Sequence, residues 1–165
     1  MKVVRTTTQA SRAFEVALRD LENKKVGKVG WFENSRYPDA DATQVAYVAA
    51  QNEYGNPNKH IPARPFMRPT IIAQQDTWKK VAEQGAKNIL RGNQTSGDVL
   101  EMIGLKASGD IRKTISKILT PPLAQSTIEA RIARHADKKT VGKLTKPLID
   151  TGLMYGTLTN VVEDE

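Results

Sequence analysis

The sequence predicts an α+β fold: a small antiparallel sheet packed by two long helices, with an extended proline-rich arm. Several long stretches repeat apolar residues every three or four positions, which is typical of helices with one buried face. Two short stretches near opposite ends of the chain have strand composition. Residues 62–69 contain three prolines. Because proline lacks the N–H and fixes φ, this stretch is neither helix interior nor central strand.

The first half of the chain predicts two helices and one strand. Residues 9–23 carry apolar side chains at i, i+3, i+4 and i+7, which indicates an amphipathic helix. Residues 26–33 have the valine and aromatic content of a strand, weakened by two glycines. The polar stretch 34–41 is expected to be a loop. Residues 42–54 predict a second helix with a face of small side chains, ended by Gly55.

The second half begins with two long helices. Thr70 fits an N-cap after the prolines, and the apolar stripe that follows predicts a helix that ends near Gly92. Residues 99–119 predict the second long helix, which Pro121-Pro122 ends. A short basic helix is expected at 126–135.

The C-terminal part predicts a lysine-rich loop, a turn at 149–154 and a final strand at 157–162. A length of 165 residues fits a single domain, 1–165, with the arm at 55–69 and the basic loop at 136–147. The aromatic content of 5% is low for a compact core of this size. This favours extended segments, or a chain that completes its core in an oligomer.

The net charge of +7 and the absence of cysteine restrict the classes of function. Basicity allows nucleic acid, acidic proteins or anionic membranes as partners. Without cysteine there is no disulfide, thiolate metal site or cysteine nucleophile. No window approaches the roughly 20 apolar residues of a membrane-spanning helix, and the N-terminus lacks the apolar run of a signal peptide. We therefore expect synthesis in the cytoplasm and no membrane partner.

Motifs of enzymes are incomplete in this sequence. His60 and His135 have no neighbouring ligand at metal spacing, and neither a phosphate-binding loop nor a nucleophile elbow is present. Asp150-Thr151-Gly152 matches the carboxylate loop of aspartic proteases. The 13 residues after Gly152 are too few for the flap and second loop of such an enzyme. We favour a structural turn in which Asp150 caps a helix start, and we expect no enzyme activity, no metal and no cofactor.

The proline-rich stretch is the strongest candidate for an interaction site. Its apolar side chains on a stiff backbone suit a segment that lies on another surface at little entropic cost. In that case Phe66 is the anchor, and Arg64 and Arg68 fix it to a neighbouring subunit. The alternative is an ordered loop that packs on its own domain. The residues predicted at a subunit interface are Tyr54, Gly55, Ile61, Pro62, Arg64, Pro65, Phe66, Met67 and Arg68.

A basic segment near the C-terminus is a second candidate surface. Its cations could contact phosphates of passing DNA or an acidic partner. The alternative, which we prefer, is a solvated loop that keeps the subunit soluble or docks on an acidic ring, because the aromatic residues of single-strand binders are missing. The cations in question are Arg131, Arg134, Lys138, Lys139, Lys143 and Lys146.

Four motifs follow one another in the chain: Val-Ala-Tyr-Val-Ala at 45–49, Asn-Glu-Tyr-Gly at 52–55, Ile-Pro-Ala-Arg-Pro-Phe-Met-Arg-Pro at 61–69 and Pro-Leu-Ile-Asp-Thr-Gly-Leu at 147–153. With the strand at 26–32, this order resembles the tailed-bacteriophage neck proteins, the tail-completion or head–tail joining family of virion morphogenesis proteins. The Arg-Pro-Phe element is the most specific part. Many relatives have serine or arginine shortly after Asp-Thr-Gly, whereas this chain has Tyr155-Gly156-Thr157.

The resemblance implies a structural protein that forms a ring between the head connector and the tail, a hexamer with a dodecamer as the alternative. Its partners would be further copies of itself, other neck and tail proteins, and the DNA that passes through. It would be found in the neck or tail of the virion, and in the host cytoplasm during assembly. The alternative, based on charge alone, is a basic nucleic-acid-binding accessory protein that uses residues 131–146.

Overall fold

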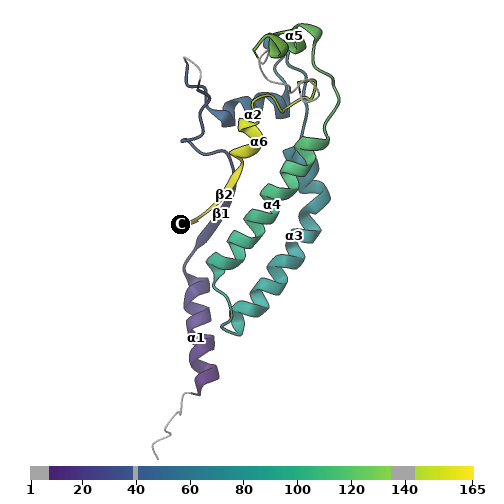
Figure 1. The fold of residues 1–165 in the computed structure, drawn as a ribbon. Helices are drawn as coiled ribbons and strands as arrows, with labels where there is room; N and C mark the ends of the chain where they lie inside the picture. The colour runs from purple at the N-terminus through teal and green to yellow at the C-terminus, as the bar shows by residue number, and fades with distance from the viewer. Residues whose placement is uncertain (1–7, 39–40, 135–143) are drawn as a thin grey trace, which may run out of the picture. The chain divides into compact units, whose positions relative to one another are not determined.

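The computed structural model describes residues 8–38, 41–134 and 144–165 (Figure 1). The predicted α+β class is confirmed, since helices and a two-stranded antiparallel sheet make up the described part. The described residues divide into two compact units: unit 1 takes those within 1–29, 75–107 and 160–165, and unit 2 takes those within 30–74 and 108–159. The two long helices contribute to both units. Whether the units together make up the single domain expected from chain length stays a prediction.

Unit 1 contains α1 (Gln9–Glu22) and the adjoining parts of α3 (Met67–Leu90) and α4 (Ser96–Lys117). Its small core consists of Ala17 from α1, Ile89 from α3 and Val99 from α4. Three residues on the apolar face of α1 are left more than 40% exposed: Phe14, Leu18 and Leu21. The face predicted from the sequence is therefore present, but unit 1 covers only part of it.

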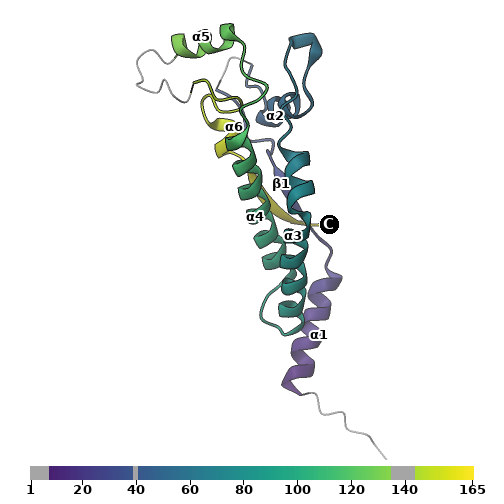
Figure 2. The same ribbon diagram turned by 90° about the vertical axis from the view of Figure 1, so that its right-hand side faces the viewer.

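Within unit 1, the segments of α3 and α4 lie side by side and run in opposite directions (Figure 1, Figure 2). Gly85 of α3 makes this close approach possible, because a Cβ at that position would lie 2.4 Å from Cγ1 of Val99. The start of α4 is fixed by a reciprocal pair of hydrogen bonds. The Thr95 hydroxyl accepts from the Asp98 N–H at 3.2 Å, and the Asp98 carboxylate accepts from the Thr95 N–H at 2.9 Å.

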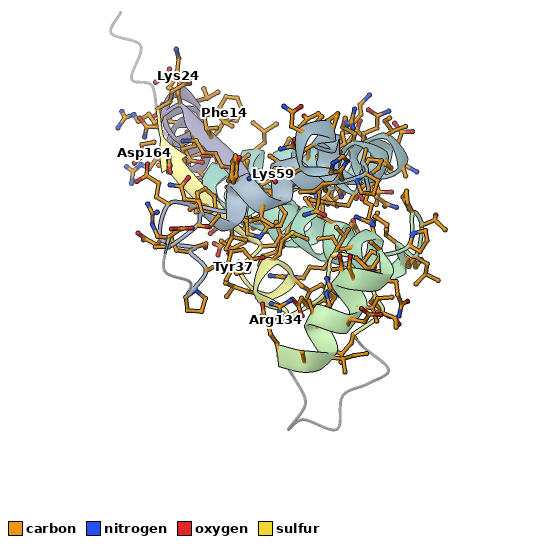
Figure 3. The ribbon with its side chains drawn as sticks, turned by 90° about the horizontal axis from the view of Figure 1, so that it is seen from above. Phe14, Lys24, Tyr37, Lys59, Arg134 and Asp164 are labelled. Atoms are coloured by element: carbon orange, nitrogen blue, oxygen red, sulfur yellow. The ribbon has the colours of Figure 1, made fainter. Side chains whose placement is uncertain are left out.

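The sheet of unit 1 is formed by β1 (Lys25–Gly30) and β2 (Thr159–Asp164), whose outermost residues Gly30 and Thr159 belong to unit 2. It packs on α4: a Cβ on Gly104 would lie 2.7 Å from Cβ of Asn160. On the exposed side, Lys28 pairs with Glu163 at 2.5 Å. At the end of the ladder, the Glu165 N–H donates to the Lys24 carbonyl at 2.9 Å, close to the labelled Asp164 in Figure 3.

Unit 2 contains α2 (Val45–Tyr54), the single-turn helix η1 (Pro57–Lys59), α5 (Gln125–Arg134) and α6 (Leu153–Gly156), with the first turns of α3 and the end of α4. Helix α6 packs beside α2. The side chains of Phe66, Ile111, Ile115 and Leu158 are fully buried and form the interior. Unit 2 therefore holds the proline-rich stretch, the basic helix and the Asp-Thr-Gly turn.

The start of α3 corrects one prediction. The helix begins at Met67, so Thr70 lies inside it and is not the N-cap. Thr70 is buried, and its hydroxyl donates to the Phe66 carbonyl and bonds the Thr114 hydroxyl, both at 2.6 Å. Pro69 is accommodated because the N–H groups of a first helical turn have no partner within the helix. The other predicted helices and strands are present, with ends shifted by no more than three residues, whereas η1 and α6 were not predicted. Most of the basic loop predicted at 136–147 lies outside the described residues.

Candidate functional site

The candidate site is built around Glu53, the penultimate residue of α2. Glu53 is only 4% exposed, and its carboxylate points at the N-terminus of α3. One oxygen, Oε2, accepts from the N–H groups of Phe66 at 2.6 Å and Met67 at 2.9 Å. The other, Oε1, accepts from the Arg68 N–H at 3.1 Å and from Arg68 Nε at 3.0 Å. A carboxylate from another element thus caps α3.

The electrostatics of this cap favour the ionised carboxylate. Burial by itself would raise the pKa of Glu53, but the N–H groups of Met67, Phe66 and Arg68 together outweigh it and hold that pKa below its ordinary value. The positive end of the α3 dipole acts in the same direction. Glu53 is therefore a charged residue that links α2 to α3.

The link between α2 and α3 is a tight loop. Gly55 has φ +79°, and a Cβ there would lie 2.9 Å from the Ala63 nitrogen, so other residues are disfavoured. Asn56 and Ile61 exchange backbone hydrogen bonds of 2.8 and 2.9 Å, and the Arg64 N–H donates to the Asn52 carbonyl at 2.7 Å. The predicted arm at 55–69 is thus folded against its own unit.

Arg64 is held inside unit 2 and is only 5% exposed. Its Nε donates to the Pro121 carbonyl at 2.7 Å and its Nη2 to the Pro122 carbonyl at 2.8 Å. Burial, and to a smaller extent the charge of Arg131, lowers the pKa of Arg64. The fork predicted to reach a neighbouring subunit therefore binds carbonyls of the same chain.

Phe66 gives the main correction to the predicted interface. Its side chain is fully buried and meets the Trp31 ring edge to face, with ring centroids 5.8 Å apart. The Trp31 Nε1 in turn donates to the Met154 carbonyl at 2.7 Å. The prediction that Phe66 anchors a neighbouring subunit is wrong for this structure. The alternative, packing within its own unit, describes both residues. Phe66 packs on Trp31, and Arg64 binds carbonyl groups of the same unit.

Two of the predicted interface residues form an exposed patch. Tyr54 is 67% exposed, and the Arg68 guanidinium lies over its ring, 4.7 Å from the centroid. We call this pair the Tyr54–Arg68 patch. An apolar hollow of about 310 Å³ adjoins it, with Trp31, Ala46 and Ile71 among its lining residues. Of the remaining predicted residues, Pro62 and Pro65 are exposed, whereas Gly55, Ile61 and Met67 are half-buried.

The basic segment is less available than its composition indicated. Arg131 is 7% exposed, and its Nη1 donates to the carbonyls of Leu144, Lys146 and Ile149 at 2.8–3.1 Å. The prediction that Arg131 contacts DNA or an acidic partner is therefore wrong. Arg134, labelled on α5 in Figure 3, is exposed. Lys146 is half-buried, with its Nζ 3.5 Å from the Ser116 carbonyl. Lys138, Lys139 and Lys143 lie outside the described residues.

The Asp-Thr-Gly turn holds these arginines. Asp150 lies 3.7 Å from Nε of Arg131 and 3.0 Å from Nη2 of Arg134. Gly152, with φ +80°, is the N-cap residue of α6, and the Thr151 hydroxyl accepts from the Leu153 N–H at 3.3 Å. The prediction that Asp150 caps a helix is therefore wrong: Gly152 is the N-cap, and Asp150 forms ion pairs with the two arginines. The prediction of a structural turn remains compatible with this geometry.

The described residues contain no group of three or more histidines and carboxylates arranged to hold a metal ion. His60 is exposed on the loop, and His135 falls outside the described residues. None of the helices in the described ranges is both long and apolar enough to cross a membrane. A search of family models, of curated proteins and of solved structures finds no match to this chain.

Proposed function

We propose that this protein is a structural component of the tailed-phage neck, which completes the tail or joins it to the head by forming a ring. The observation that carries the proposal is the meeting of the resembling motifs in unit 2. The Asn-Glu-Tyr-Gly motif caps the helix that follows the Arg-Pro-Phe motif, through Glu53. The Asp-Thr-Gly motif leads into α6, which packs beside α2. Motifs far apart in sequence thus form one structural element.

Assembly would proceed through surfaces held by this element. The Tyr54–Arg68 patch presents an aromatic residue and an arginine, the residue types that dominate interface energies. The exposed apolar residues of α1 would bury against another subunit, as expected for a chain that completes its core in an oligomer. A closed ring needs one head-to-tail contact per subunit. The resemblance favours six subunits, with twelve as the alternative.

In this proposal the protein acts by binding and needs no enzyme activity or cofactor. Its partners are its own copies and the other neck and tail proteins, and DNA passes the ring. It is located in the neck or tail of the virion and in the host cytoplasm before assembly. The rival proposal, a basic nucleic-acid-binding accessory protein, is supported by the net charge of +7 alone. A DNA shift assay with increasing salt distinguishes the two.

The decisive experiment localises the chain in intact particles. Gold-labelled antibody against the protein should mark the junction of head and tail in negatively stained virions. Particles assembled without the protein should then accumulate as separate heads and tails. Label elsewhere on the particle, or complete virions that lack the chain, would refute the proposal. The substitution Tyr54→Ala, which leaves the cap of α3 intact, should reduce incorporation, and Lys79→Ala on the exposed surface of α3 serves as the control.

A further inference from the structure

An open groove lies beside the loop that follows α2. It has a volume of about 1040 Å³, at the upper end of the range of ligand sites. One wall is the loop 54–64 and the other is the segment 122–131, and all of these residues belong to unit 2. Pro57, Pro62 and Pro122 give both walls rigid apolar surface. Such a groove suits an extended chain more than a compact small molecule.

The charge of the groove has one sign. Its lining includes Lys59, His60, Arg64 and Arg131, and it contains no aspartate or glutamate. Lys59, which is labelled in Figure 3, and His60 are exposed at the rim. Arg64 and Arg131 lie deeper, each less than 10% exposed. Arg131 is held by carbonyl groups and by Asp150, so an acidic ligand would meet attraction from Lys59 at the rim and from Arg64 at the base.

Arg64 supplies the second, independent observation. Among the described residues, its hydrogen bonds go to two backbone carbonyls, from Nε and Nη2, and no carboxylate pairs with it. Asp150, the acidic partner of the neighbouring Arg131, is shared between Arg131 and Arg134. A buried cation is costly unless a counter-charge compensates it. A carboxylate that enters the groove would provide that counter-charge.

We propose that this groove binds an extended acidic segment of another protein, with one of its carboxylates paired to Arg64 and its backbone lying between the proline walls. A peptide fits better than a nucleic acid. Phosphates of a duplex bind exposed cations on a broad surface, whereas the two arginines here are recessed between apolar walls. A single side chain can reach such a recess, and a stiff double helix cannot. The inference does not depend on the neck function, since any protein with an acidic segment could be the partner.

The test uses a fluorescein-labelled octapeptide of alternating glutamate and proline. This peptide is extended in solution, and its prolines cannot add a strand to the sheet of unit 1 because they lack N–H groups. We expect binding to the full-length protein, measured by fluorescence anisotropy, and no binding of the glutamine–proline analogue. Arg64→Gln should abolish binding, with circular dichroism to check that the variant is folded. Because Arg64 is buried, rim variants provide the second measurement.

The combined Lys59→Glu and His60→Glu variant should weaken the peptide about tenfold, as attraction at the rim becomes repulsion. The combined Lys79→Glu and Lys80→Glu variant changes two exposed residues of α3 outside the groove and should bind like the wild type. Absence of peptide binding would overturn the inference, and so would equal losses in the two variants. It would also be overturned if a 20-base-pair DNA duplex bound at the same site and lost affinity in the rim variant while the peptide did not, since the groove would then serve nucleic acid.

Discussion

Glu53→Gln is the sharpest test of the way unit 2 is held together. The two oxygens of Glu53 each accept two hydrogen bonds: Oε2 from the Phe66 and Met67 N–H groups, and Oε1 from the N–H and Nε of Arg68. A glutamine has one acceptor oxygen. Whichever way its amide is turned, the NH₂ group faces two donors. The substitution therefore loses two charge-assisted bonds while keeping the volume of the side chain almost unchanged.

The magnitude follows from those two bonds. At about 1.5 kcal/mol for each bond to a charged group, the free energy of unfolding should fall by about 3 kcal/mol. For a chain of this length, that corresponds to a decrease in Tm of roughly 6–12 °C. The loss should be confined to unit 2, since Glu53 and all its partners belong to that unit.

The fluorescence of Trp31 is the natural assay, because this ring packs on Phe66. Trp78 is the other tryptophan of the chain, so the measurement uses a Trp78→Phe background with urea as denaturant. Glu83→Gln is the matched control: it makes the same chemical change at an exposed position of α3 and should stay within about 0.5 kcal/mol of the background protein. If Glu53→Gln unfolds at the same urea concentration as this control, the capping role assigned to Glu53 is wrong.

Three further outcomes are expected. The pKa of Glu53 lies below its ordinary value of 4.5, so its contribution to stability should be complete above pH 4.5 and disappear as the pH falls through the lower folded-state pKa. The free energies of unfolding of the wild type and Glu53→Gln, measured as the pH is lowered, should therefore converge. Gly85→Ala should destabilise by about 1–3 kcal/mol in urea unfolding through overlap with Val99, whereas Gly109→Ala, with open space around its Cβ, should be neutral or stabilise by up to about 1 kcal/mol. Phe66→Ala should cost the monomer about 3–5 kcal/mol in the same assay, and a stable monomer with a lost oligomer would instead restore Phe66 as an interface anchor.

Sequence reasoning located the helices α1 to α5 because their residue patterns are a local property, but it missed the short helices η1 and α6. The ends were less accurate where the capping groups were overlooked or lie elsewhere in the chain. The start of α4 could have been found from the capping box Thr95-x-x-Asp98, whose Thr95 lies four residues before the predicted start. The start of α3 could not be found in this way, because its cap is Glu53 on another helix. No local pattern at 67–70 contains that information.

The orientation of the charged residues was the harder problem. In the sequence, Arg64 and Arg131 look like ordinary exposed cations. In the structure each is buried, and its guanidinium group donates hydrogen bonds to backbone carbonyls of other segments. One signal was available. Val45, Ala49 and Glu53 are spaced by four residues, so the carboxylate lies on the same face of α2 as two small apolar side chains, and all three are buried. A carboxylate in line with a buried face requires donors, and a helix N-terminus is the commonest source of several N–H groups together.

The cap also determines which residues can be used to examine assembly. Glu53 binds the Arg68 side chain twice, through Oε1 to Nε at 3.0 Å and through its carbonyl to Nη2 at 3.1 Å, and Arg68 lies over Tyr54. The interior of unit 2 and the Tyr54–Arg68 patch are therefore coupled through one residue. Loss of a ring in a Phe66 or Glu53 variant would be ambiguous, because the monomer itself is weakened. Tyr54 is free of this ambiguity: it is 67% exposed, so replacing it changes the surface while the cap of α3 stays intact.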